Sequence, residues 1–318
     1  MSAAASGAPR ASPLLASLSA LARLGRFRFL AGGVVLYGLG TVLAARTRPL
    51  NLMAYAIGQC AITTTQLMTH YANDYFDLRA DRANPTPTKW SGGSRVLADG
   101  QLSPKVAWNA TLLLAAVSLV LDTWILLGIH VSPGTPLLLL VVLILSFEYS
   151  GPPLCLHARS LGPLTAGLVV GALTPLAGFG MQGGAWSRES LLAVVPTMLA
   201  QFAMILVLDF PDAVGDAKAG KRTMVVRLGR ARTTRVCVGV MVATYASVPL
   251  LAWADLPIPM AAALVLTVPA GIWLAWTLLR GTWRRGGEFA PLVWRGVLWF
   301  TLVSLAEVAG ALATIVGR

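Results

Sequence analysis

Acidic residues are scarce in this sequence, and nearly half of them gather in two short segments. Asp and Glu number only 13 in 318 residues, and six of these lie within residues 73–81 and 209–216. Carboxylates clustered in an otherwise apolar chain are costly unless water or a cation neutralises them. These two segments are therefore the first candidates for chemistry.

The first segment places oxygen-bearing side chains at a helical spacing. Asn73, Asp77 and Asp81 stand four residues apart. On a helix, side chains at this spacing lie above one another and form one stripe. The first segment therefore predicts one row of amide and carboxylate oxygens.

The second segment forms a second stripe. Asp209, Asp212 and Asp216 are separated by three and then four residues, and like charges so placed destabilise a helix unless a cation neutralises them. Oxygen ligands without His or Cys suit Mg²⁺, which completes its shell with water and substrate phosphate. Two facing stripes of this kind would hold metal ions that bridge a diphosphate.

The elements that must position these residues are membrane-spanning helices. The chain is 56% hydrophobic and 12% charged, against roughly 25% charged residues in a soluble domain. Runs of roughly 17–25 apolar residues indicate spans, so we expect an all-α, polytopic membrane domain at 29–318 behind an N-terminal cytoplasmic tail at 1–28. Nine spans are expected, at 29–45, 52–70, 106–128, 135–149, 161–181, 190–208, 236–254, 257–279 and 296–316.

The basic residues predict the orientation of these spans. With the N-terminus inside, 21 of the 25 Lys and Arg fall in cytoplasmic segments and 4 on the opposite side, as the positive-inside rule requires. A multi-pass protein of the cell membrane is expected, in contact with membrane lipid and with both acidic segments cytoplasmic. This explains the net charge of +12 without a nucleic-acid partner.

An ordinary explanation also exists for each stripe, because hydrophilic loops that join spans carry acids solvated by water. One stripe alone would favour that explanation. Two stripes on one side of the membrane, in a chain with few other acids, favour the metal site.

Positive side chains follow each stripe. Arg and Lys can bind phosphate oxygens and stabilise a departing diphosphate, although loops on this side carry basic residues for topological reasons as well. The sequence Ser-Gly-Gly-Ser at 91–94 is compatible with phosphate-binding amides or with a flexible turn. The basic candidates are Arg79, Arg82, Lys89 and Arg95 after the first stripe, and Lys218, Lys221 and Arg222 after the second.

With these motifs in place, the chain resembles the UbiA superfamily of membrane prenyltransferases over nearly its whole length. The resemblance includes the nine expected spans and three motifs between them. These motifs are Asn73-Asp74-x-x-Asp77-x-x-x-Asp81, then Tyr149-Ser150-Gly151-Pro152-Pro153 with Arg159 and Gly162 following, and Asp212-x-x-x-Asp216-x-x-x-Gly220-Lys221-Arg222-Thr223, continuing to Arg227-Leu228-Gly229.

The resemblance implies a helical bundle around a central cavity, in which Mg²⁺ binds a prenyl diphosphate. Loss of diphosphate then creates an allylic cation that an electron-rich aromatic acceptor attacks. The residues so assigned are Asp77, Asp212 and Asp216 for catalysis; Asn73, Asp77, Asp81, Asp209, Asp212 and Asp216 for Mg²⁺; Arg79, Lys89, Arg95, His157, Lys218, Lys221 and Arg222 for the diphosphate; and Tyr149 for the acceptor or the cation.

Within the superfamily, the second and third motifs resemble the menaquinone-pathway branch, which prenylates 1,4-dihydroxy-2-naphthoate. Three positions depart from that branch: His157 replaces its usual Lys, Pro163 its usual Glu, and Pro211 a common basic residue. The acceptor is therefore expected to be this naphthoate or another quinone precursor.

Two other functions remain open from the sequence. A terpene cyclase of the same superfamily would ionise the diphosphate identically and quench the cation within the molecule or with water. An ion-coupled transporter is disfavoured, because the acids cluster at one surface and not at the midplane of the membrane. The isolated acids Asp122, Glu148 and Glu307 are expected to form hydrogen bonds at helix ends or in the interior.

Overall fold

Long apolar segments dictate an architecture built from helices, because a backbone in lipid must satisfy its own hydrogen bonds. The computed structural model describes residues 13–316, with side chains from residue 15 onward, and this part of the chain contains no strand. The predicted all-α class is confirmed. The helices are α1 (Pro13–Leu24), α2 (Phe27–Ala45), α3 (Leu52–Phe76), α4 (Leu78–Ala83), α5 (Pro104–Gly128), α6 (Thr135–Glu148), α7 (Gly162–Ala166), α8 (Thr174–Gly180), α9 (Arg188–Lys218), α10 (Met224–Leu228), α11 (Arg230–Trp253), α12 (Ile258–Val265), α13 (Val268–Leu279) and α14 (Phe289–Val316). Short 3₁₀ turns lie at His157–Arg159, Thr282–Arg284 and Gly286–Glu288, and a π-helical stretch at Gly167–Leu173 joins α7 to α8.

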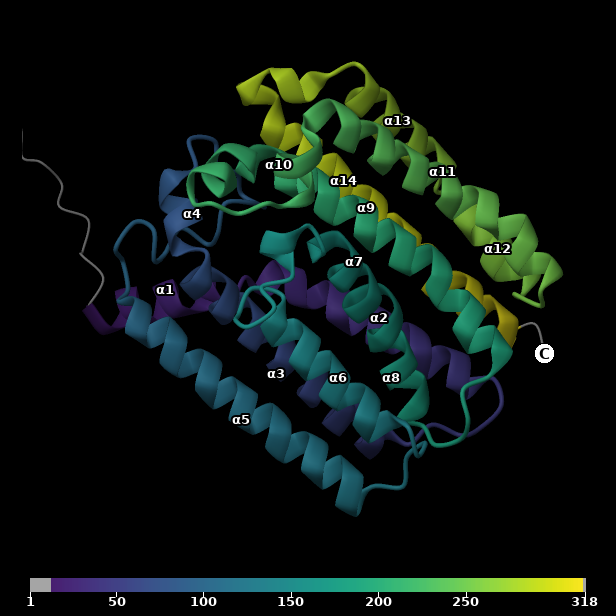
Figure 1. The fold of residues 1–318 in the computed structure, drawn as a ribbon. Helices are drawn as coiled ribbons and strands as arrows, with labels where there is room; N and C mark the ends of the chain where they lie inside the picture. Colours follow the sequence, from purple (N-terminus) through teal and green to yellow (C-terminus); the bar gives the residue numbers. More distant parts are fainter. Residues whose placement is uncertain (1–12, 317–318) are drawn as a thin grey trace, which may run out of the picture.

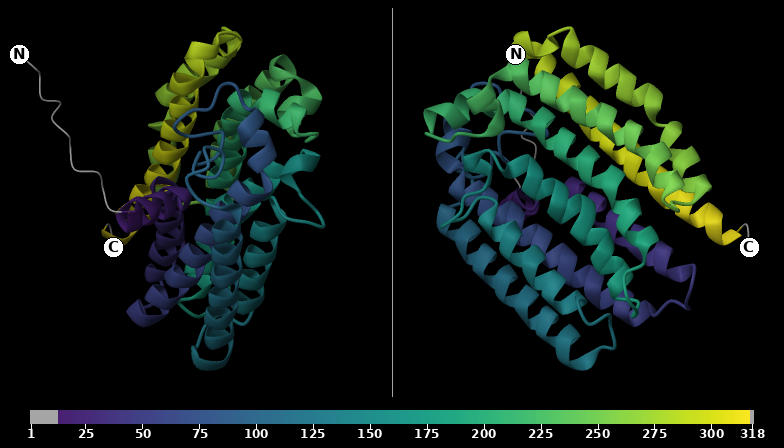
Figure 2. Two further views of the ribbon diagram at one scale, coloured as in Figure 1. Left: turned by 90° about the vertical axis from the view of Figure 1, so that its left-hand side faces the viewer. Right: turned by 45° about the vertical axis from the view of Figure 1, so that its right-hand side comes forward.

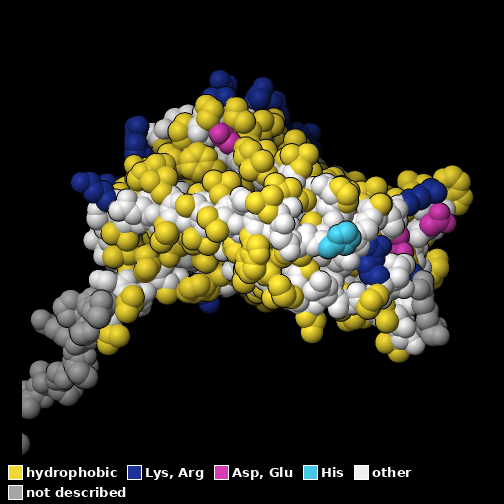
Figure 3. Space-filling view, turned by 90° about the horizontal axis from the view of Figure 1, so that it is seen from below, with side chains coloured by type: hydrophobic (Ala, Val, Ile, Leu, Met, Phe, Trp, Pro, Cys, Tyr) yellow, Lys and Arg dark blue, Asp and Glu magenta, His cyan; other side chains and the backbone are white. Residues whose placement is uncertain are grey.

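The long helices run side by side in one slanted bundle (Figures 1 and 2). Helix α3 packs along α5, α2 along α8, and α9 along both α11 and α14. The short helices α1, α4 and α10 gather at one end of the bundle, and α14 ends at the other (Figure 1). Seen from below, hydrophobic side chains cover much of the molecule, with Lys and Arg toward its margins (Figure 3).

Fewer helices are long and apolar enough to cross a membrane than the nine that the sequence predicts. Six helical segments in the described part of the chain are long and apolar enough to cross, and α12 with α13, bent by 41°, makes a seventh. Helix α6 has only 14 residues. Helix α3 has 25 residues but is not among the segments apolar enough to cross, because one of its faces carries polar side chains into a cavity. The nine predicted ranges all overlap helices, whereas nine crossings remains a prediction.

Glycine allows the two neighbouring helices α2 and α8 to touch at their backbones. A Cβ atom at Gly40 would lie 1.7 Å from the Pro175 carbonyl oxygen, and one at Gly178 would lie 2.0 Å from the Tyr37 carbonyl oxygen. Any larger residue would force the helices apart. This contact sets the distance between α2 and α8.

The predicted tail at 1–28 contains the start of this structure. Residues 1–12 lie outside the described part of the chain, and α1 follows them and packs on α3. Arg26, between α1 and α2, has a left-handed backbone with φ of 47°. The described part of the predicted tail therefore lies against the bundle, while its boundary at residue 28 remains a prediction.

Two of the three isolated acids differ from expectation. Asp122, in α5, is buried, and its Oδ2 atom has no hydrogen-bond partner in the described structure. The Glu148 carboxylate accepts a hydrogen bond of 2.7 Å from the Leu154 amide, as expected for a helix end. Glu307, inside α14, is fully buried, and neither of its carboxyl oxygens has a hydrogen-bond partner in the described structure. The prediction of an interior hydrogen bond for Glu307 is wrong, because the residues around it on α14 are apolar or satisfied within the helix, as Ser304 is by the Phe300 carbonyl.

Candidate active site

A cavity of about 450 Å³ opens between the helices and receives both acidic segments. Side chains of α2, α3, α6, α9 and α14 and of the π-helical stretch line it. Asp77, Asp81 and Asp212 lie at one end, and residues such as Val169, Met204 and Phe300 make the remainder mainly apolar. One compartment therefore combines an ionic end with an apolar interior.

The first acidic segment does not stay on one helix. Helix α3 ends at Phe76, and Asp77, whose amide still bonds the Asn73 carbonyl at 2.8 Å, separates it from α4. Asn73 donates its side-chain amide to the Asp77 carboxylate at 2.8 Å and to the Ser150 hydroxyl at 2.9 Å. The expected row of oxygens is therefore divided between two helices, with Asp81 on the second, although all three side chains line the cavity.

Asp81 lies against the glycine loop. A Cβ atom at Gly93, whose φ is +74°, would lie 2.1 Å from the Asp81 carboxylate. Burial and the carboxylates of Asp77 and Asp74 raise the pKa of Asp81 to about 8. The loop at 91–94 thus closes over the acids and is not a free turn.

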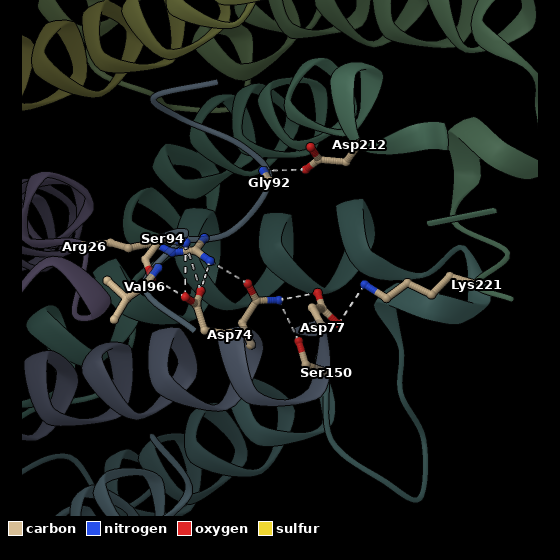
Figure 4. A network of polar contacts seen from close by, with 10 residues as sticks. Arg26, Asp74, Asp77, Gly92, Ser94, Val96, Ser150, Asp212 and Lys221 are labelled. Carbon is tan, nitrogen blue, oxygen red and sulfur yellow. Dashed lines mark hydrogen bonds and ion pairs between the residues drawn. The ribbon is translucent and has the colours of Figure 1, made fainter. Parts of the chain in front are cut away.

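Arg26 completes the same corner of the site. Its guanidinium donates to the Asn73 side-chain oxygen at 3.0 Å and pairs with Asp74, which also accepts hydrogen bonds from Ser94 (Figure 4). Burial alone would lower the pKa of Arg26, but the carboxylates of Asp74 and Asp81 hold it above its ordinary value. Arg26 was not among the predicted residues, since nothing in the sequence links it to a motif 47 residues away.

The second acidic segment stays on one helix, because α9 continues through Pro211 to Lys218. Asp212 accepts hydrogen bonds from the Asn84 side-chain amide at 2.8 Å and from the Gly92 amide at 3.0 Å. Asp212 is therefore tied to the two segments that follow the first stripe (Figure 4). Asn84, like Arg26, was not predicted.

Lys221 joins the two acidic segments. Its ammonium lies 2.7 Å from the Asp77 carboxylate and 3.3 Å from the Asp216 carboxylate. Burial alone would lower the pKa of Lys221, but these two carboxylates raise it above its ordinary value. Lys221 is therefore a fixed positive charge between the stripes (Figure 4).

A third ionic contact involves His157, which lies in a 3₁₀ turn. Its Nε2 atom is 3.2 Å from the Asp209 carboxylate, and its ring stacks on Tyr149 with centroids 5.1 Å apart and planes at 7°. Burial would lower the pKa of His157, but Asp209 raises it above its ordinary value. Asp209 therefore favours the protonated form of His157, which stands at one of the positions where the sequence departs from the menaquinone branch.

The structure brings most, but not all, of the predicted residues to the cavity. Arg79, Lys218 and Arg222 are exposed and are not among its lining residues. Arg95 donates to the Asp81 carbonyl and pairs with Asp99 at 2.8 Å, and Lys89 lies over Trp90 at the rim. Their roles toward a diphosphate remain predictions. The predicted residues that do line the cavity are Asn73, Asp77, Asp81, Tyr149, His157, Asp209, Asp212, Asp216 and Lys221.

The chemistry of the site fits Mg²⁺ bound together with a phosphate ligand. No three His, Cys, Asp or Glu side chains within residues 13–316 already form a metal cage. One buried carboxyl oxygen each of Asp209 and Asp216 has no hydrogen-bond partner in that range. Mg²⁺ commonly takes one or two carboxylates and completes its shell with water and substrate phosphates, so these free oxygens suit it. The Mg²⁺ ligand set remains a prediction.

Comparison with known proteins shows the family and the fold. The chain matches the model of the UbiA prenyltransferase family over residues 33–311. It is 25% identical over 195 residues to 1,4-dihydroxy-2-naphthoate octaprenyltransferase from Bacillus subtilis (strain 168), and that match spans 60% of each protein.

Solved structures share the fold. A UbiA homolog from Archaeoglobus fulgidus bound to DMAPP and Mg²⁺ superposes with a TM-score of 0.66 at 17% identity, covering 94% of this chain and 99% of that one. A structure of a UbiA homolog from the same organism bound to GPP and Mg²⁺ gives 0.65 at 16% identity, covering 93% and 99%. The resemblance found in the sequence is thereby confirmed, and the chain belongs to the UbiA prenyltransferase family.

Proposed function

We propose that this protein transfers a prenyl group from a prenyl diphosphate to an aromatic acceptor within the membrane, with Mg²⁺ as its cofactor. The main observation behind this proposal is that acids from two segments far apart in the sequence line one cavity whose interior is mainly apolar. A prenyl diphosphate has the same two-part character, with an anionic head and an apolar chain. The solved UbiA homologs bound to DMAPP or GPP and Mg²⁺ support this assignment.

In this proposal the ionic end binds the diphosphate. Carboxylates at Asp77, Asp212 and Asp216, with Asn73, Asp81 and Asp209, would hold Mg²⁺, which when bound supplies Lewis-acid stabilisation of the leaving diphosphate. Lys221, and His157 when it is protonated, would add positive charge on the same side and donate hydrogen bonds to phosphate oxygens. Cleavage of the carbon–oxygen bond leaves an allylic cation in the apolar part of the cavity.

Tyr149 lines the cavity near the place where we propose that the allylic cation forms and the acceptor attacks it. Its ring lines the cavity beside His157, and an aromatic face stabilises a nearby cation. We propose that Tyr149 faces the allylic cation or the acceptor ring. The acceptor we favour is 1,4-dihydroxy-2-naphthoate or a related quinone precursor, which the Bacillus subtilis relative supports. The orientation we favour places this end of the bundle in the cytoplasm, as the distribution of Lys and Arg indicates.

The test is a product screen with purified protein in detergent. Prenyl diphosphates of several lengths are offered with 1,4-dihydroxy-2-naphthoate, 4-hydroxybenzoate, a sugar phosphate or no acceptor, and products are identified by mass. We expect pyrophosphate release and a prenylated aromatic product that require both acceptor and Mg²⁺. Hydrocarbon or alcohol released without any acceptor would instead identify a cyclase, and full activity in excess EDTA would refute the role of Mg²⁺.

A further inference from the structure

One titratable side chain of the cavity has no part in the chemistry proposed above. His70 lies on α3, three residues before Asn73, and lines the cavity together with Thr65, Gln66 and Thr69. These spacings place all five residues on one face of the helix. Because a helix rises 1.5 Å per residue, His70 sits about 4.5 Å along the helix axis from Asn73, on the side away from the acids.

The imidazole of His70 has no hydrogen-bond partner in the described structure, and its Nε2 atom is buried. Its polar neighbours on the same face are already engaged. Gln66 donates to the Phe29 carbonyl at 2.8 Å, and the Thr69 hydroxyl donates to the Thr65 carbonyl at 2.8 Å. A buried polar group without a partner costs roughly 1–3 kcal/mol, so His70 and the similarly unpaired Gln201 amide oxygen are the groups that a ligand would satisfy here.

One aromatic ring, that of Phe29, lies beside this imidazole, and Trp90 packs against Phe29 in turn. The rings of His70 and Phe29 have centroids 6.0 Å apart, and those of Phe29 and Trp90 lie 5.7 Å apart, edge to face. All three rings line the cavity, and we name Phe29, His70 and Trp90 the aromatic corner. Flat apolar ligands pack well against such rings, while an imidazole can accept one hydrogen bond and donate another.

We propose that the aromatic corner is the acceptor subsite and that His70 hydrogen-bonds a hydroxyl group of the acceptor. The inference rests on the proposed prenyl transfer and narrows its acceptor to hydroxylated aromatic compounds. The position suits the reaction, because a ring held one helical turn from Asn73 lies beside the end of the cavity at which the diphosphate leaves. His70 is in this account a specificity-determining residue, separate from the diphosphate machinery.

The test compares acceptors that differ by one hydroxyl. With the acceptor found in the product screen and its analogue in which hydrogen replaces one hydroxyl, kcat/KM is measured for the wild type, His70→Leu and His70→Gln. A site built to bind a hydroxyl discriminates strongly against the analogue that lacks it. We expect at least a tenfold preference for the hydroxylated compound in the wild type, its loss in His70→Leu, and partial recovery in His70→Gln.

Controls separate this role from a structural one. His130 is an exposed histidine outside the cavity lining, and His130→Leu should retain the full preference. The KM for the prenyl diphosphate should be unchanged in both His70 variants. An equal loss of kcat/KM for both acceptors, or a raised KM for the prenyl diphosphate, would overturn the role of His70. A true acceptor without a hydroxyl would overturn this inference and leave the proposed transfer intact, whereas a wild type that prenylates nothing would overturn both.

Discussion

The ammonium of Lys221 lies 2.7 Å from the Asp77 carboxylate and so links the loop after α9 to the end of α3. The same ammonium lies 3.3 Å from Asp216, so one cation neutralises one acid from each motif. All three side chains are largely buried, with 12%, 12% and 4% of their surfaces exposed. Lys221 occupies the place between the motifs at which a divalent cation with its diphosphate would be expected.

Removing this cation should destabilise the protein. In Lys221→Met, two buried carboxylates lose their partner, and the loss of one member of a buried ion pair costs about 3–5 kcal/mol. The thermal unfolding midpoint in detergent should fall, and Mg²⁺ alone should raise it more in the variant than in the wild type, because the metal can replace the lost positive charge. Lys105→Met, at an exposed lysine, is the control and should unfold like the wild type. An equal Mg²⁺ effect in all three proteins would show that Lys221 does not share a site with the metal.

A glycine sets the distance between the two acidic segments. A Cβ atom at Gly215 would lie 2.5 Å from the Ala80 carbonyl oxygen and 2.9 Å from the Asn84 Cβ atom. Gly215→Ala should push α4 away from α9 and separate Asp81 from Asp212. We expect kcat/KM to fall roughly 100-fold, since a misplacement of 1 Å can cost that much.

The matched control lies on α11. A Cβ atom at Gly239 meets no heavy atom within 4 Å, so Gly239→Ala should keep full activity and gain about 0.5–1 kcal/mol from the better helix former. A Gly215→Ala enzyme with normal kcat/KM would mean that close packing of α4 on α9 is not required.

The sequence predicts that the acids of the second segment share one face of a helix, because the spacing of these residues along the chain determines the face on which they lie. Carboxylates at i, i+3 and i+7 define a helix face, and α9 presents Asp209, Asp212 and Asp216 to the cavity as that pattern requires. The break at Asp77 was not predictable in the same way. A run of Asn, Asp and Leu is compatible with a continuous helix, and nothing local in the sequence marks the interruption between α3 and α4, which packs on α9.

Residues joined only by tertiary structure were also missed. Arg26 reaches Asn73 across 47 residues from a left-handed backbone position, and Asn84 reaches Asp212 across 128. Neither residue has a local pattern that marks it. The hydropathy of α3 was also misleading for a tertiary reason. His70 and Gln66 line the cavity and so lower the hydropathy of a helix that the sequence predicts to cross the membrane.

The unpaired acid in α14 predicts a stabilising substitution. Glu307 is fully buried without a hydrogen bond in the described structure, and it lies outside the cavity lining. Glu307→Leu should increase the free energy of unfolding by about 1–3 kcal/mol, because it removes a buried polar group that has no partner. Ser304→Ala, one turn earlier and satisfied by the Phe300 carbonyl, should give no gain. A loss of stability in Glu307→Leu would show that Glu307 has a partner absent from this account.

The central claim is that the two acidic segments act on one diphosphate, and a double-mutant cycle tests it most directly. Mg²⁺-dependent binding of a prenyl diphosphate is measured for the wild type, Asp77→Asn, Asp212→Asn and the double variant. The control is Asp255→Asn, at an exposed acid outside the cavity lining. Groups that hold one ligand jointly are strongly non-additive. We predict that each single variant weakens binding of the prenyl diphosphate at least 10-fold. The double variant should bind only slightly more weakly than the single variant with the lower affinity. Fully additive losses, or normal binding in either single variant, would contradict the account.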